Sequence, residues 1–141
     1  MPSELRKELE PIFRTHRVQL AYLFGSRATG QAGPLSDFDF GVLFHPTLSP
    51  AERFRRSLEL SADLTGVLHT QRLDVVILNE APPTIRFNVI TQGRVIYNED
   101  ELVRVRFEAK TMSEYFDTEP LRRLYRARLF AAIASGEFYD R

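Results

Sequence analysis

The chain has 141 residues with 19 acidic and 19 basic side chains, so its formal net charge is zero. A neutral total argues against a general nucleic-acid coat, which needs an excess of cations, and the lack of cysteine excludes disulfides, thiolate metal sites and cysteine nucleophiles. No signal peptide or membrane-spanning run is present in the sequence, so we expect a soluble, cytoplasmic protein. We expect one domain over residues 1–141, with a core over about 1–100 and a helical tail over about 101–141.

The chain begins with a predicted amphipathic helix over residues 4–16, where apolar side chains recur at the spacing of one helix face. Ser3 is its expected N-cap, and His16 is interpreted as a helix-end or core-edge residue. The run Val18 to Phe24 that follows is short, apolar and aromatic, which predicts a buried strand.

A turn-rich connection separates this strand from the next. Residues 25–36 hold three glycines and one proline, a composition typical of turns. Asp37 to Phe44 is then predicted as a second strand, with residues that alternate at its start and become apolar later.

A helix over 51–64 follows, with Phe54, Leu58 and the stretch Ser61 to Ala62 expected to face the core and Gly66 expected as the C-cap. Leu73 to Leu78 is rich in β-branched residues and predicts a third strand.

The remaining elements are a short helix over 84–91, a short edge strand over 94–97 and two C-terminal helices. The second of these helices starts near Thr118 and Pro120 and stops at Gly136. Apolar residues recur at helical spacing in both, at Leu102, Val105, Ala109, Met112 and Phe116, and at Leu121, Leu124, Tyr125, Leu129, Ala132 and Ile133. The expected fold is α/β (α+β), with a small mixed β-sheet flanked by helices.

Three carboxylates are expected to meet at one edge of this sheet. Asp37 and Asp39 project from the same face of the second strand, about 7 Å apart, and Asp74 starts the third strand. A strand–helix–strand crossover makes the two strands parallel neighbours, so their starts share one edge. Two Mg²⁺ ions suit such an oxygen-rich site, and a metal pair assists phosphoryl transfer. The alternative is that these residues are solvated aspartates at strand starts.

The loop ahead of these residues carries a second set of candidates. Gly25 allows the backbone to approach a ligand closely, Ser26 adds a hydroxyl donor, and Arg27 offers a forked guanidinium to phosphate oxygens. Arg27 could equally be a surface residue of the turn, and the whole loop could be a connection without a ligand.

Together these residues resemble a known signature. Residues 23–44 match the pattern Gly-Ser-x10-Asp-x-Asp of DNA-polymerase-β-like nucleotidyltransferases in the run LFGSRATGQAGPLSDFDFGVLF, and Asp74 matches the third carboxylate. The small size and the run from Leu73 to Asp100 are similar to the minimal nucleotidyltransferases, the MntA-like antitoxins encoded beside HEPN-domain RNase toxins. The likeness covers roughly residues 18–100 well and the tail only loosely.

This resemblance implies ATP as the donor, Mg²⁺ as the cofactor and transfer of AMP to a hydroxyl, in that subgroup a tyrosine of the partner toxin. Under this hypothesis Asp37 and Asp39 hold both metals, and the triphosphate reaches the Gly25–Ser26 turn. Asp74 completes the metal nearest the acceptor and helps to take the hydroxyl proton. Two alternatives stay open: a non-catalytic antitoxin that acts by complex formation, and the catalytic subunit of a small-molecule or nucleic-acid nucleotidyltransferase. No direct binding to nucleic acid or membrane is expected.

The last helix has two interpretations. Its arginines Arg122, Arg123 and Arg126 lie opposite the leucine stripe, where they form either a solvated face or a docking face for a partner. Aromatic residues that would strengthen docking are Tyr115, Phe116, Phe138 and Tyr139.

Overall fold

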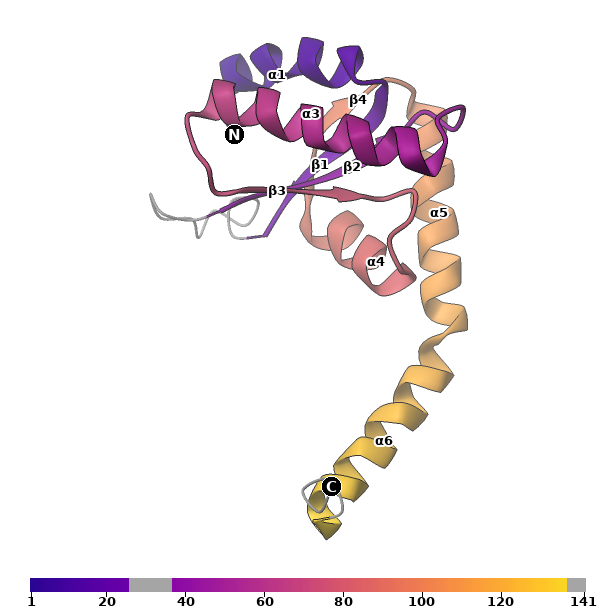
Figure 1. Cartoon of the computed structure of the whole chain (residues 1–141). Coiled ribbons are helices and arrows are strands. Elements are labelled where there is room, and N and C mark those ends of the chain that lie inside the picture. Colours follow the sequence, from indigo (N-terminus) through magenta and orange to yellow (C-terminus); the bar gives the residue numbers. More distant parts are fainter. Residues whose placement is uncertain (26–36, 137–141) are drawn as a thin grey trace.

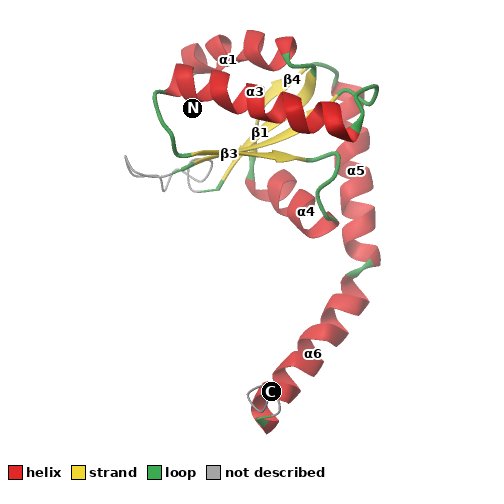
Figure 2. Cartoon of the chain, in the orientation of Figure 1, coloured by secondary structure: helices red, strands yellow, loops and turns green. Residues whose placement is uncertain are grey.

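The computed structural model describes residues 1–25 and 37–136. Within them lies a four-stranded sheet of order β3-β2-β1-β4 (Figure 1). Strands β2 and β3 are parallel, and β1 pairs antiparallel with both β2 and β4. Helices flank this mixed sheet (Figure 2), which confirms the expected α+β class. Strand β4 lies at an edge, as predicted.

The elements follow the predicted order along the chain. The strands are β1 (Val18–Phe24), β2 (Phe38–Phe44), β3 (Leu73–Ile77) and β4 (Arg94–Asn98). The helices are α1 (Ser3–Thr15), α3 (Pro50–Leu68), α4 (Pro83–Gln92), α5 (Glu101–Asp117) and α6 (Glu119–Ser135). Helix α6 has a proline in its first turn and ends at Gly136, which adopts a left-handed conformation with φ 80°. Both features match the predictions for this helix.

Two hydrophobic cores lie on the two faces of the sheet. Helices α1 and α3 cover one face and α4 and α5 the other (Figure 1). The first core contains Phe13, Phe40 and Leu64, and the second contains Tyr22 and Val89. Alternate residues of β2 therefore serve different cores, as the period of a strand requires.

The ends of two helices differ from the prediction. Helix α3 runs four residues past the expected end, so Gly66 lies inside it, and the C-cap is His69 with φ 54°. The apolar residues Val67 and Leu68 pack against the first core and extend the helix. The N-cap of α1 is Pro2 without a side-chain hydrogen bond, and Ser3 is already helical.

The inward face of α3 also differs. Phe54 is 62% exposed and Leu58 is 58% exposed, whereas the buried residues of this helix are Ser57, Leu60 and Leu64. At 3.6 residues per turn the two sets lie roughly 100° apart around the helix axis. The expectation that Phe54 and Leu58 face the core was therefore wrong, because Leu60 and Leu64 fill the site against the sheet.

His16 forms the C-cap of α1, which confirms its placement at the helix end. The residue is 5% exposed, and its Nε2 forms a 2.6 Å hydrogen bond with the Asp63 carboxylate of α3. This contact joins the two helices on one face of the sheet.

Among the described residues no helix has the length and apolar character that crossing a membrane requires.

Candidate active site

Asp39 and Asp74 lie side by side where the parallel strands β2 and β3 begin. The register pairs these two residues directly, and paired residues of neighbouring strands project from the same face of a sheet. Phe38 and Phe40 belong to the opposite face, where they pack in the first core. The crossover through α3 thus brings two of the three predicted carboxylates together.

Asp37 stands just before β2 and is engaged with a residue that the sequence reasoning did not consider. Arg72 Nε donates a hydrogen bond of 2.7 Å to Asp37 Oδ1. Arg72 directly precedes β3, and its carbonyl accepts a hydrogen bond from the Phe38 amide at 2.9 Å. The strand register places Asp37 beside Arg72 just as it places Asp39 beside Asp74. The signal for this contact is the register itself: once Asp39 is paired with Asp74, the residues two positions earlier, Asp37 and Arg72, also lie side by side.

The three carboxylates interact electrostatically even though Asp37 is paired with Arg72. Burial raises the pKa of Asp39 above its ordinary value, and the negative charges of Asp74 and Asp37 raise it further. The charged form of Asp39 is therefore disfavoured where it stands. A cation bound at this edge would relieve the repulsion.

Gly25 is the point where the backbone of β1 comes closest to this group. Its φ is +77°, and a Cβ built on it would lie 2.5 Å from Asp39 Oδ2. The antiparallel register pairs the preceding Phe24 with Asp39. Glycine suits this position for two reasons: it adopts the left-handed conformation readily, and a side chain here would displace the Asp39 carboxylate. The other predicted loop residues, Ser26 and Arg27, lie outside the described residues.

The donor set fits a magnesium ion in its chemistry. Asp37, Asp39 and Asp74 offer hard oxygen ligands, which Mg²⁺ prefers together with water and phosphate oxygens. Within residues 1–25 and 37–136, however, no three acidic, histidine or cysteine side chains are gathered closely enough to hold a metal. The ion pair with Arg72 gives a reason, because it holds the Asp37 carboxylate on a cation already present. The carboxylates of Asp37, Asp39 and Asp74 are therefore neighbours, and they would have to move closer together to bind one cation.

Comparison with known proteins agrees with this geometry. The family described as polymerase beta, nucleotidyltransferase, matches residues 7–102, which include all three carboxylates and the Gly25 turn. A relative from Shewanella oneidensis named protein adenylyltransferase MntA is 35% identical over 102 residues, covering 70% of this chain and 67% of its own. A relative of the same name from Aphanizomenon flos-aquae is 31% identical over 108 residues, covering 69% of each chain.

Solved structures show the same fold. A toxin–antitoxin crystal structure with AMP-PNP contains a chain that superposes with a TM-score of 0.74 at 26% identity, covering 92% of this chain and 99% of that one. A complex of a tri-AMPylated HEPN toxin with its MNT antitoxin, from Shewanella oneidensis, gives a TM-score of 0.68 at 24% identity, covering 92% and 99%.

Proposed function

The chain belongs to the polymerase beta nucleotidyltransferase family, and on this basis we propose that it transfers AMP from ATP to a hydroxyl group of a partner toxin. It would thereby act as an antitoxin. Two relatives are named protein adenylyltransferases, and a structural neighbour was crystallised as a toxin–antitoxin with AMP-PNP. We propose a HEPN-family toxin as the partner and a tyrosine side chain as the acceptor.

The observation that carries this proposal is the direct pairing of Asp39 with Asp74 at the edge where Gly25 ends β1. The hydrophobic core does not need this carboxylate pair. The pair places two like charges on neighbouring strands and raises the pKa of Asp39. A bound cation would offset this repulsion between the carboxylates. Functional residues typically lower the stability of the fold where they stand, because their arrangement serves ligand binding.

In the proposed site, Asp37, Asp39 and Asp74 would hold Mg²⁺, which neutralises charge on the phosphates and on the attacking oxygen. The acceptor oxygen attacks the α-phosphorus of ATP, the bond from that phosphorus to the bridging oxygen breaks, and pyrophosphate leaves. The chain's own contribution is to position the groups and to supply negative charge, since phosphoryl-type transfer needs little covalent work from the protein. Asp74 is exposed on the rim, where it could take the acceptor proton.

Gly25 gives the phosphates room to approach. Because it has no Cβ, the Asp39 carboxylate and the backbone of the turn can both face the same small volume. We propose that the Gly25–Ser26 turn and Arg27 contact the triphosphate. Substituting Ser26 or Arg27 should then raise the concentration of ATP needed for half-maximal transfer.

The experiment that tests this function is transfer of label from ATP labelled at the α-phosphate. The chain is incubated with Mg²⁺, labelled ATP and the protein encoded by the neighbouring gene, and the label is located by mass spectrometry. Wild type should label a hydroxyl of the partner, and the double variant Asp37→Asn/Asp39→Asn should lose at least about 1,000-fold in rate. The double variant Glu4→Gln/Glu8→Gln on the exposed face of α1 removes the same charge elsewhere and should keep full activity.

Each outcome separates the competing functions. Label found on a nucleic acid or a small molecule would show that the acceptor is not a protein, and would contradict the proposed acceptor. Neutralisation of the partner without any label, by wild type and the Asp double variant alike, would indicate a non-catalytic antitoxin and contradict the proposal.

A further inference from the structure

Helix α6 leaves the body of the protein without burying its apolar side chains. It extends from the end of α5 away from the sheet (Figure 1), and none of its residues is buried. Leu121 is 68% exposed and Tyr125 is 69% exposed. An open hollow of 460 Å³ lies beside them and is lined by Leu121, Arg122, Tyr125 and Arg126. A helix exposing this much apolar surface marks an interaction site.

Phe130, 66% exposed, lies on the opposite side of α6 from Leu121, but the other large apolar residues of this helix, with Ala132, form one stripe. They recur at i, i+3, i+4, i+8, i+11 and i+12, the pattern of an amphipathic helix that buries one face: Leu121, Leu124, Tyr125, Leu129, Ala132 and Ile133. We call this set the α6 stripe. Within residues 1–25 and 37–136 no element of the chain buries this stripe, so the described body of the protein does not explain it.

The base of α6 is fixed, which makes the stripe a preformed surface. Arg122 lies over the Tyr115 ring at 3.8 Å and donates a 2.9 Å hydrogen bond to the Tyr115 carbonyl. The other face of Tyr115 belongs to α4, because Phe87 stacks on this ring at 3.8 Å. An ion pair between Arg86 and Glu114 joins the same two helices. The start of α6 is thus tied to α5 and, through it, to α4.

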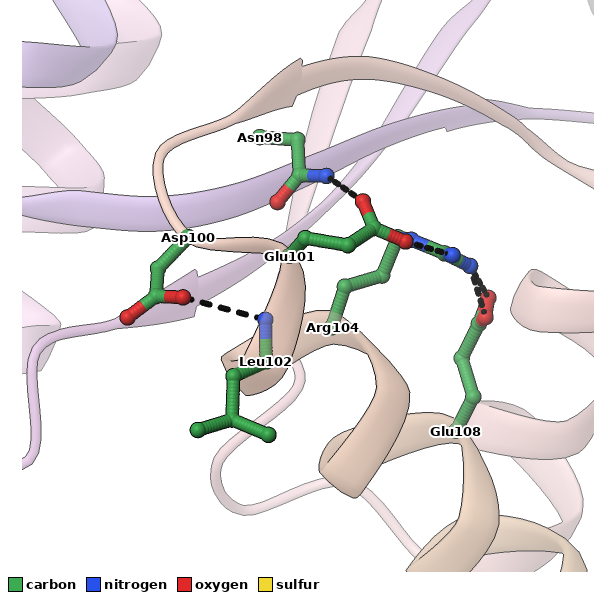
Figure 3. Close-up of polar contacts among 6 residues, drawn as sticks. All are labelled: Asn98, Asp100, Glu101, Leu102, Arg104 and Glu108. Carbon is green, nitrogen blue, oxygen red and sulfur yellow. Dashed lines mark hydrogen bonds and ion pairs between the residues drawn. The ribbon is translucent and has the colours of Figure 1, made fainter.

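The far end of α5 is held as well, so the support reaches back to the sheet. Asp100 caps α5 by accepting a 3.0 Å hydrogen bond from the Leu102 amide. Asn98 at the end of β4 donates to Glu101 at 2.7 Å, and Arg104 bridges Glu101 and Glu108 (Figure 3). Both ends of α5 are therefore anchored.

The charge of α6 indicates what kind of surface would cover it. Residues 119–135 contain four arginines and one glutamate, a net charge of +3. Glu119 contacts three of these arginines, Arg122, Arg123 and Arg126. Arg128 has no acidic partner within the part of the chain that the structure describes, and at seven residues from Leu121 and three from Tyr125 it lies on the stripe itself. A covering surface must therefore offer a carboxylate amid apolar contacts.

We propose that the α6 stripe docks into an apolar groove of the partner toxin, bordered by acidic side chains of which one pairs with Arg128. This mode, an amphipathic helix in a hydrophobic groove, gives affinity through the buried apolar side chains and orientation through the charge pair. A second copy of the chain is a poorer occupant, because two α6 helices of charge +3 repel each other. The inference rests on the proposed function, since the partner is the acceptor of AMP.

The comparison with solved structures shows that at least part of this helix has a counterpart in a toxin–antitoxin chain. The match to the toxin–antitoxin chain covers 92% of this chain, whereas residues 1–118 make up about 84% of it. Part of α6 therefore belongs to the architecture shared with a chain from a toxin–antitoxin structure.

Affinity measurements on full-length variants test the proposal. The protein encoded by the neighbouring gene is immobilised, and binding of wild type is compared with Leu121→Gln/Tyr125→Gln, which removes apolar surface without changing charge. Affinity should fall at least 100-fold. The matched control is Phe54→Gln/Leu58→Gln on α3, whose side chains are 62% and 58% exposed, and its affinity should change less than threefold. Circular dichroism and binding of a fluorescent ATP analogue verify that all variants are folded.

Two further arms decide the remaining points. Arg128→Gln should weaken binding about tenfold and reduce its salt dependence. Equal binding by wild type and the stripe variant would overturn the inference while leaving the proposed function intact. Self-association of wild type that the stripe variant abolishes in analytical ultracentrifugation, with partner binding unchanged, would assign the stripe to a second copy and also overturn it. If wild type itself does not bind the partner, the proposed function fails first.

Discussion

Arg72 and Asp37 form an ion pair at the edge of the candidate active site, with Arg72 Nε 2.7 Å from Asp37 Oδ1. The two residues extend the parallel register that pairs Asp39 with Asp74. One cation and three carboxylates therefore occupy adjoining positions, and the guanidinium already neutralises one of the predicted metal ligands.

Removing this guanidinium should strengthen metal binding in the absence of nucleotide. Both side chains are about half exposed, so the pair contributes at most about 1 kcal/mol. Arg72→Gln should then raise the affinity for Mn²⁺ about two- to fivefold, measured by electron paramagnetic resonance of free Mn²⁺. Arg55→Gln on α3 removes an equal charge away from the site and should leave this affinity unchanged. A weaker Mn²⁺ affinity in Arg72→Gln would show that Arg72 supports the site instead of competing with the metal.

Asp39→Asn should stabilise the fold while it abolishes activity. The pKa of Asp39 is raised in the folded state, so at pH values between its ordinary pKa and the raised one the folded protein holds a proton that the unfolded chain has lost. The free energy of unfolding therefore falls as the pH rises through that window. The amide carries no such penalty. Its melting temperature at pH 7.5 in EDTA should exceed that of wild type by about 1–3 °C, after allowance for solvent screening.

The pH dependence provides the check on this explanation. The advantage of Asp39→Asn should shrink as the pH is lowered toward 4, because wild type then becomes protonated at Asp39. An advantage that is constant between pH 4 and 7.5 would show that packing, and not charge, causes it.

Gly25→Ala should damage both the site and the fold. The new Cβ would lie 2.5 Å from Asp39 Oδ2, and the residue would keep a φ of +77°. The left-handed conformation costs an alanine about 1 kcal/mol, and the Asp39 carboxylate must also move. We expect the melting temperature to fall by about 4 °C or more and Mn²⁺ affinity to fall at least tenfold. Gly66→Ala, inside α3 with open space around its Cβ, is the control and should not destabilise the protein. Unchanged Mn²⁺ affinity in Gly25→Ala would separate this turn from the metal site.

The topology at the site could be predicted from the sequence. A strand, a helix and a strand in succession predict parallel neighbours, which places Asp39 and Asp74 at one edge of the sheet, whereas their direct pairing depends on the register. The contact between Arg72 and Asp37 requires the register of the two strands, which a crossover alone does not specify. A search confined to acidic and glycine-rich motifs also passes over a basic residue that precedes a strand.

Helix faces and ends were harder to predict than the elements themselves. In α3, apolar residues occur on two faces, at Phe54 and Leu58 and at Leu60 and Leu64, and only packing against the sheet selects the second pair. The stripe of α6 was visible in the sequence, but its exposure was not. Whether an amphipathic helix packs on its own chain depends on where the preceding helix points it, which local spacing does not determine.

The end of α3 gives a further prediction about stability. The sequence offered Gly66 as the C-cap, but the left-handed position is occupied by His69 with φ 54°. His69 is exposed, so replacing it by glycine loses no packing. His69→Gly should raise stability by about 0.5–1 kcal/mol, measured by urea unfolding. His45→Gly, at a residue without positive φ, is the comparison and should not stabilise. No gain in His69→Gly would mean that the histidine side chain offsets its backbone strain.

A crystal of the chain with Mn²⁺ and a non-hydrolysable ATP analogue tests most directly whether Asp39 and Asp74 together hold the metal of the bound nucleotide. We predict an anomalous Mn²⁺ peak within about 2.5 Å of carboxylate oxygens from both residues, with the triphosphate reaching toward Gly25. A nucleotide-bound Mn²⁺ that contacts neither carboxylate, or a nucleotide seated away from this edge of the sheet, would contradict this prediction.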